Sequence, residues 1–92
     1  MFIGYLRVDI FIPNSHSLKD RRQVLQQIKQ RVRNKFNISV AQKPGDKWQR
    51  CELFFVGTNY TKNKANDLMQ HIEDFIRFQD GTCILEVERG VI

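Results

Sequence analysis

In the N-terminal segment from Phe2 to Ile12, apolar side chains occupy the even positions apart from Gly4, while the odd positions mix apolar and polar residues. A period of two is typical of a β-strand with one buried face. Pro13 and Asn14 then interrupt the alternation. We therefore expect a first strand that buries its even-numbered residues.

The next segment, from Ser17 to Phe36, has the spacing of an amphipathic helix. Ser17 with Asp20 three residues later resembles a capping box, in which Asp replaces the usual Glu. Apolar residues then recur at helical spacing and form one stripe: Leu18, Leu25, Ile28, Val32 and Phe36. The pattern predicts a long helix with one face on the core and the other in solvent.

The rest of the chain predicts three more strands and a second helix. Two strands, Asn37 to Gln42 and Trp48 to Tyr60, are separated by a turn at Pro44-Gly45-Asp46. Thr61 is a candidate N-cap for a helix whose apolar stripe ends before Asp80 and Gly81. The last strand is expected from Thr82 to about Arg89.

The resulting order β-α-β-β-α-β predicts an α+β ferredoxin-like fold. This fold is a two-layer sandwich in which two helices cover one face of an antiparallel sheet with the strand order 4-1-3-2. The length of 92 residues fits one domain spanning residues 1–92. Strand alternation places the following residues on the open face: Ile3, Tyr5, Arg7, Asp9, Phe11, Arg50, Glu52, Phe54, Val56, Ile84, Glu86 and Glu88.

Positive charge is concentrated in the first predicted helix. Residues 17–36 hold seven of the fifteen Lys and Arg residues and one acid, so they carry +6, against +5 for the whole chain. At about 100° per residue, one flank of the helix carries Lys19, Arg22, Lys29 and Arg33, and Arg22 to Arg33 spans about 16 Å. A solvated helix face is the alternative, but such a face usually carries acids for i,i+4 pairs. The charge therefore favours a polyanionic partner.

Arg21 differs from the other bases because it falls within the apolar stripe of this helix. We expect its side chain either to snorkel at the helix end or to be aimed into a site. At the far end of the helix, the topology is expected to bring Lys62 and Lys64 towards Arg33 and Lys35.

The topology also places the hairpin turn beside the start of the first helix. The turn carries Lys43 and Lys47, and Trp48 and Arg50 follow it. The backbone N–H groups at the start of a helix and nearby cations can bind a phosphate. A flat aromatic ring beside them can stack on a base. The alternative for the Trp side chain is a lid over the sheet edge.

The open sheet face permits two further interpretations. Its apolar members Tyr5, Phe11, Phe54, Val56 and Ile84 favour burial against a second copy of the chain, as a homodimer. An RNA-recognition motif is disfavoured, because the third strand lacks the glycine-aromatic pattern of that motif.

Catalysis is the minority hypothesis. Asp9, Glu52, Glu86 and Glu88 are the acids that a metal-dependent nuclease would need. Arg7 and Arg50 in the same region favour cross-strand ion pairs instead. The sequence has no nucleophile triad, P-loop or dinucleotide motif, so we assign no catalytic residue, metal or cofactor.

The two cysteines, Cys51 and Cys83, are expected two strand spacings apart, about 9.6 Å. Because a disulfide cannot span that distance, we expect two buried free thiols. The apolar N-terminal run is interrupted by Arg7 and Asp9 and has no small-residue cleavage site after it. We expect a cytoplasmic protein without a membrane segment.

Four stretches taken together resemble a known family. They are Ser17-Leu18-Lys19-Asp20-Arg21-Arg22, Phe36-Asn37-Ile38-Ser39-Val40-Ala41, Trp48-Gln49-Arg50 and Glu86-Val87-Glu88-Arg89. In order and spacing they resemble the YlxP-like family of small bacterial proteins of unknown function, over nearly the whole chain. The resemblance implies a ferredoxin-like fold. Family members are often encoded near translation initiation factor two and ribosome-binding factor A, which implies a role around ribosome assembly or translation. It implies no catalytic residue.

The leading hypothesis is a non-enzymatic RNA-binding or ribosome-associated module with no small-molecule substrate. Its candidate contacts are Lys19, Arg21, Arg22, Lys29, Arg33, Lys43, Lys47, Trp48, Gln49 and Arg50. The alternatives are a homodimeric protein-docking module that uses the open sheet and a metal-dependent nuclease.

Overall fold

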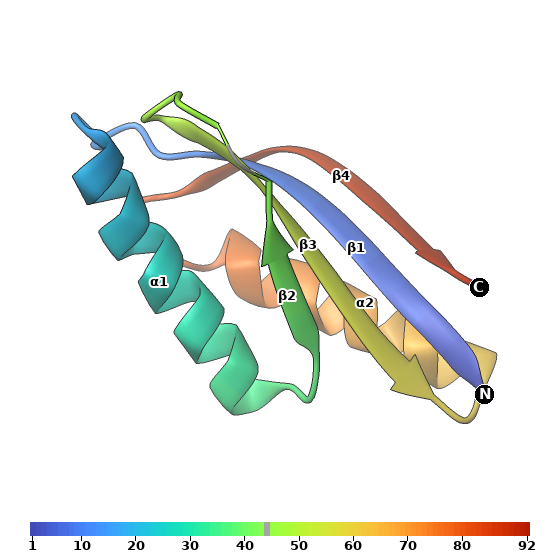
Figure 1. The fold of residues 1–92 in the computed structure, drawn as a ribbon. Coiled ribbons are helices and arrows are strands. Elements are labelled where there is room, and N and C mark those ends of the chain that lie inside the picture. Colours follow the sequence, from blue (N-terminus) through green and yellow to red (C-terminus); the bar gives the residue numbers. More distant parts are fainter. Residues whose placement is uncertain (44) are drawn as a thin grey trace.

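The computed structural model describes residues 1–43 and 45–92 and has the predicted order of elements (Figure 1). The elements are β1 (Phe2–Phe11), α1 (Leu18–Lys35), β2 (Ser39–Gln42), β3 (Arg50–Asn59), α2 (Lys62–Arg77) and β4 (Cys83–Val91). All neighbouring strands are antiparallel, and their order is β2-β3-β1-β4. This order is the predicted 4-1-3-2 read from the other edge, so the fold is ferredoxin-like. Pro44 of the predicted turn lies outside the described residues.

Both predicted helix N-caps are confirmed. The Ser17 hydroxyl accepts a hydrogen bond from the Asp20 N–H at 3.1 Å, and the Asp20 carboxylate accepts one from the His16 N–H at 3.0 Å. The Thr61 hydroxyl accepts a hydrogen bond from the Lys64 N–H at 3.2 Å. These bonds satisfy backbone donors that have no partner inside the helix, and they fix where each helix begins.

The hydrophobic core lies between the two helices and one face of the sheet. It consists of Leu6, Val8, Ile10, Ile12, Leu25, Ile28, Val32, Cys51, Leu53, Phe55, Met69, Ile72 and Ile76. The even-numbered residues of β1 are therefore buried, as the alternation predicts. Alternate residues of β3, namely Cys51, Leu53 and Phe55, belong to the same core. The helices α1 and α2 contribute apolar residues to it at helical spacing.

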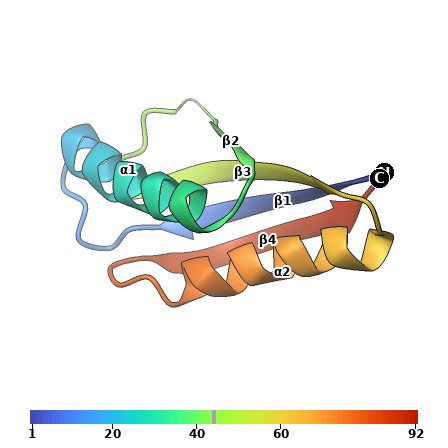
Figure 2. The ribbon, with the colours of Figure 1, turned by 90° about the horizontal axis from the view of Figure 1, so that it is seen from below.

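The two helices are staggered along the long axis of the molecule (Figure 2). The C-terminal end of α1 meets the C-terminal half of α2. The rings of Phe36 and Phe75 pack edge to face with centroids 5.9 Å apart, and the Lys35 amine lies 5.0 Å from the Phe75 centroid. One turn earlier on α1, the Arg31 guanidinium donates to the Gln79 side-chain oxygen at 2.8 Å.

The stagger contradicts one expectation about the basic residues. Lys62 precedes Phe75 by thirteen residues of α2, which is about 20 Å of helix axis. The prediction that Lys62 and Lys64 approach Arg33 and Lys35 is therefore wrong. The start of α2 lies at the opposite end of the molecule from α1, so the two groups of bases form no continuous track (Figure 1).

A β-bulge shifts the register between β1 and β4. Asp9 pairs with Glu86, whereas the next residue, Ile10, pairs with Ile84. Leu85 is the extra residue and is 51% exposed. On one side of such a bulge, the odd- and even-numbered residues of the strand exchange the sheet faces to which their side chains point.

The bulge corrects two predictions for the start of β4. Because paired residues share a sheet face, Ile84 lies with Ile10 on the covered face and packs against the core. The prediction that Ile84 belongs to the open face is wrong. Cys83, paired with Phe11, takes that place and is exposed, so the expectation of two buried thiols holds only for Cys51.

Gly4 of β1 allows α2 to approach the sheet closely. A Cβ at this position would lie 2.8 Å from the Ala65 backbone oxygen and 2.9 Å from the Met69 Cγ. We expect Gly4→Ala to lower the free energy of unfolding in urea by about 1–3 kcal/mol, the usual cost of overpacking. Gly45→Ala is the matched control, because no described residue has a heavy atom within 4 Å of its Cβ. Equal stability of the two variants would contradict this packing.

Candidate nucleic-acid interface

The helix α1 carries most of the unneutralised charge of the molecule. Its seven bases are Lys19, Arg21, Arg22, Lys29, Arg31, Arg33 and Lys35. Within residues 1–43 and 45–92, none of them forms an ion pair. Five of the seven are exposed, Lys29 is half-buried and Arg21 is buried. The helix therefore presents to solvent a positive field that the rest of the chain leaves uncompensated.

Lys29 shows which side of the molecule the predicted basic flank faces. Its amine donates a hydrogen bond to the Gln42 side-chain oxygen of β2 at 2.9 Å. The flank that also holds Lys19, Arg22 and Arg33 therefore lies on the side of α1 next to β2, and those three side chains are exposed. Lys29 is held against β2, so its amine is less available to bind a phosphate than the side chains of Lys19, Arg22 and Arg33.

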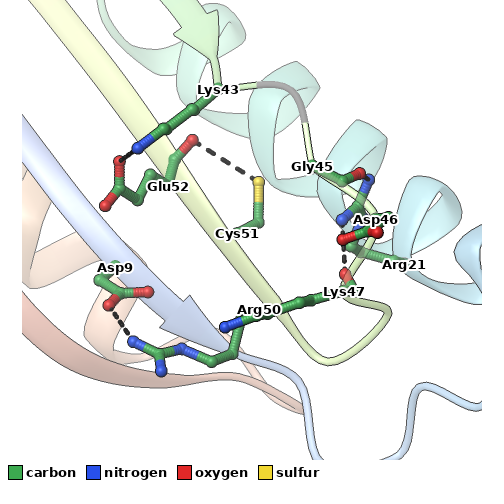
Figure 3. Close-up of a pocket in the computed structure, with 9 residues that line it drawn as sticks. All are labelled: Asp9, Arg21, Lys43, Gly45, Asp46, Lys47, Arg50, Cys51 and Glu52. Atoms are coloured by element: carbon green, nitrogen blue, oxygen red, sulfur yellow. Dashed lines mark hydrogen bonds and ion pairs between the residues drawn. The ribbon is translucent and has the colours of Figure 1, made fainter.

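Arg21 occupies the interior rather than the surface. Its side chain is 6% exposed, and its two terminal nitrogens donate to the backbone oxygens of Lys47, at 2.5 Å, and Gly45, at 3.1 Å (Figure 3). Its Nε is buried without a partner among the described residues. The side chain does not snorkel, and its terminal nitrogens are already used. Arg21 fastens the loop between β2 and β3 to the first turn of α1.

The same loop is fastened at its other end to the chain that follows β1. The Gln49 backbone oxygen accepts a hydrogen bond from the Ile12 N–H at 2.7 Å. The Gln49 side-chain amide donates to the Pro13 oxygen at 3.3 Å. The prediction that this loop lies beside the start of α1 is confirmed. Nothing in the sequence signalled that the Gln49 side chain would tie the loop to Pro13.

A cavity of about 270 Å³ lies between the loop and the start of β3 (Figure 3). Its lining residues are Asp9, Arg21, Lys43, Gly45, Asp46, Lys47, Arg50, Cys51 and Glu52. Arg50 pairs with Asp9 at 2.6 Å, and Lys43 pairs with Glu52 at 3.6 Å. The lining therefore neutralises much of its own charge, and Lys47 is a base there without an ion pair among the described residues.

A second hollow, of about 410 Å³, lies on the Trp48 side of the loop. We call it the Trp48 hollow; its lining residues are Phe11, Asp46, Lys47, Trp48, Gln49 and Arg50. The Trp48 side chain is 52% exposed, so it does not form a buried lid over the sheet edge. The hollow combines aromatic, basic and hydrogen-bonding side chains.

The open sheet face carries a charge network of its own. Arg7 lies 3.5 Å from Glu52, 3.3 Å from Glu86 and 3.3 Å from Glu88. The hydrogen bond to Glu88, with the charges of Glu86 and Glu52, holds the pKa of Arg7 above its usual value, although partial burial opposes the shift. The predicted cross-strand ion pairs are confirmed, including that of Asp9. In the part of the chain that the structure describes, no three His, Cys, Asp or Glu residues are grouped to hold a metal.

The apolar residues of the open face are only partly exposed to a binding partner. Tyr5, Phe11 and Phe54 are half-buried, and Val56 is 42% exposed. With Ile84 turned to the core, four of the five predicted interface residues lie on this face. No helix of the described chain is long and apolar enough to cross a membrane.

Three comparisons place the chain among known proteins. The model of a family described as "Protein of unknown function (DUF503)" matches residues 3–89. The chain is 32% identical over 75 residues to "Uncharacterized protein YlxP" of Bacillus subtilis (strain 168), a match that covers 80% of this chain and 82% of that protein. A de novo designed protein with a ferredoxin fold, solved by NMR, matches with a TM-score of 0.48 and 18% identity, over 99% of this chain and 85% of that one.

Arg21 should contribute more to stability than its exposed neighbour Arg22. Arg21→Met removes two charge-assisted hydrogen bonds, so we expect the free energy of unfolding to fall by about 1.5–3 kcal/mol. Arg22→Met is the matched control and should change it by less than about 0.5 kcal/mol. Urea denaturation gives both values, and hydrogen exchange of the 45–49 amides reports loosening of the loop. Equal effects of the two substitutions would contradict the anchoring role.

The two thiols should differ sharply in reactivity. Burial raises the pKa of Cys51 above its ordinary 9.0, although Arg21 and Lys29 oppose the shift. We therefore expect iodoacetamide at pH 8 to alkylate Cys83 first and Cys51 only after unfolding, as read by mass spectrometry. A Cys83→Ser variant should show one slow site. Alkylation of Cys51 before Cys83 would contradict its burial.

The same shift has a consequence for stability. Below pH 9 the Cys51 thiol is protonated in both the folded and the unfolded chain. Above about pH 9, the unfolded chain loses the Cys51 proton before the folded chain does. The free energy of unfolding therefore falls as the pH rises towards the pKa of Cys51 in the folded chain.

Proposed function

The chain belongs to the DUF503 family of proteins of unknown function, and we propose that it is a non-enzymatic module that binds RNA, free or in the ribosome, through phosphates along α1. The observation that carries the proposal is that five of the seven bases on α1 are exposed and have no ion pair among the described residues. A protein surface that concentrates unpaired bases on one helix is the electrostatic footprint of a polyanion site.

The bases outside α1 differ from those on α1, because most of them are in ion pairs. Outside α1, five of the eight bases are in ion pairs: Arg7, Lys43, Arg50, Arg77 and Arg89. Acids are thus available in the chain, but most of them lie on the sheet and on α2. The single acid of α1, Asp20, accepts a hydrogen bond from the His16 N–H at the start of the helix. Like charges three or four residues apart cost a helix about 0.2–0.5 kcal/mol per pair. Phosphates bound along α1 would remove that repulsion.

The dimensions of α1 suit several phosphates. From Arg22 to Arg33 the helix spans about 16 Å, and in double-stranded DNA, for comparison, successive phosphates of one strand are about 3.4 Å apart along the axis. Phosphate contacts alone do not distinguish RNA from DNA. The choice of RNA, and of the ribosome as its setting, rests on the association with translation that the family resemblance implies.

The other two hypotheses have less support. Self-association through the open sheet would use Tyr5, Phe11, Phe54 and Val56, but the charge network around Arg7 occupies the same face and is already satisfied. A metal-dependent nuclease would need its acids free, whereas each acid of this face has a basic partner.

Reversing charge on α1 should weaken RNA binding specifically. We expect Arg22→Glu with Arg33→Glu to raise the Kd for a structured RNA by about tenfold or more and to lower the salt slope by about 2, since two phosphate contacts are lost. Anisotropy of labelled RNA across a salt series measures both quantities.

The matched control is Lys62→Glu with Lys64→Glu. It makes the same change in net charge at two exposed bases of α2 that form no ion pair with any described residue and lie far from the bases of α1 (Figure 1). We expect it to raise the Kd much less. Equal losses in the two double variants would show a net-charge effect and contradict a site on α1. Absence of binding by the native chain at low salt would overturn the proposed function.

A further inference from the structure

Trp48 is a half-exposed aromatic residue on a loop that is fastened on both sides of it. The preceding carbonyl, that of Lys47, accepts from the buried Arg21 at 2.5 Å, and the following carbonyl, that of Gln49, accepts from the Ile12 N–H at 2.7 Å. The indole itself is 52% exposed. Ring stacking and cation–π contacts among the described residues involve Phe36 and Phe75, not Trp48. The backbone on both sides of Trp48 is therefore held in place, while its ring stacks on no other aromatic ring of the described residues.

The surroundings of this ring define what it can bind. The Trp48 hollow has a volume of about 410 Å³, which is within the range of small-molecule sites, about 300–1,000 Å³. Phe11 forms an apolar part of the lining. Lys47 supplies a base that forms no ion pair with any described residue, whereas Arg50 is paired with Asp9. A flat ring next to a free cation matches a base with its phosphate.

We propose that the Trp48 hollow binds one unpaired nucleotide of single-stranded RNA, with its base stacked on the indole and its phosphate at Lys47. The inference rests on the proposed function and adds that the RNA is single-stranded at this point. In a duplex, both faces of an internal base are covered by neighbouring bases, so only an unpaired or terminal base can stack on a protein ring. Stacking of this kind is worth about 1–3 kcal/mol per base.

The hollow adjoins the basic flank of α1. Arg21 lies in the first turns of the helix, between Lys19 and Arg22, and contacts the backbone of Lys47. A strand that follows the flank towards the start of α1 therefore reaches the hollow. Arg21 acts as a positioning residue, because it touches the loop and not the nucleotide.

The test uses the fact that Trp48 is the single tryptophan of the chain. The probes are an eight-nucleotide RNA without self-complementarity and the same strand annealed to its complement. We expect the single strand to quench the intrinsic fluorescence of the native chain at saturation, while the duplex leaves it nearly unchanged. Equal quenching by both probes, or none by the single strand, would overturn the proposal.

Substitutions make the test independent of fluorescence. Trp48→Ala should raise the Kd for the labelled single strand about 5- to 150-fold, which corresponds to the stacking energy of about 1–3 kcal/mol. Trp48→Phe should retain most of the affinity, because a ring remains. Tyr60→Ala removes an aromatic side chain that is 86% exposed, at the opposite end of β3, and is the matched control. Its Kd should equal that of the native chain.

The outcomes separate the two proposals. If both probes bind in a manner that depends on Arg22 and Arg33, but Trp48→Ala leaves the single-strand Kd unchanged, the hollow proposal is wrong and the proposed function stands. If neither probe binds at low salt, the proposed function is wrong, and the inference fails with it. Arg21→Met should raise the single-strand Kd and also shift the Trp48 emission of the free protein, as expected for a positioning residue.

Discussion

The buried guanidinium of Arg21 holds together the part of the molecule on which both proposals depend. Removing a charge from water costs several kcal/mol unless good hydrogen bonds replace the lost hydration. Here two backbone carbonyls, of Gly45 and Lys47, supply that replacement. Because a displaced loop would leave the buried charge without partners, the loop has one strongly preferred position. The first turn of α1 and the Trp48 hollow are thereby fixed relative to each other.

A second constraint is the separation of charge between α1 and the sheet. On the open sheet the acids and bases face each other across strands, and Arg7 alone meets three carboxylates. On α1 the bases meet neutral partners, such as Gln42 and Gln79, or water. The other helix, α2, does share charge with the sheet, because its Glu73 pairs with Arg89 of β4 at 2.7 Å. The positive field is consequently strongest along α1, which steers an anionic partner to that helix.

Most of the fold could be predicted from local patterns, because periods of two and 3.6 depend only on neighbouring residues. The wrong predictions concern features that depend on contacts between residues far apart in the sequence. The bulge at Leu85 reverses parity and moves Ile84 to the core, although nothing in the sequence of β4 marks an extra residue. The stagger of the helices depends on the Phe36–Phe75 contact. In the site, the basic flank followed from spacing alone. The partners of Arg21 could not be predicted, because they are backbone carbonyls 24 and 26 residues away.

The two parts of the proposed site, the bases of α1 and Trp48, lose different amounts of conformational entropy on binding. Each long base on α1 is exposed and loses up to about 1.5–2 kcal/mol of side-chain entropy when a phosphate immobilises it. Trp48 has few rotamers, and its backbone is already held on both sides, so it loses little. Exposed charges chiefly raise the rate of association, whereas a desolvated stacking contact chiefly slows dissociation. The α1 flank would therefore attract the strand, and the Trp48 hollow would determine how long it stays.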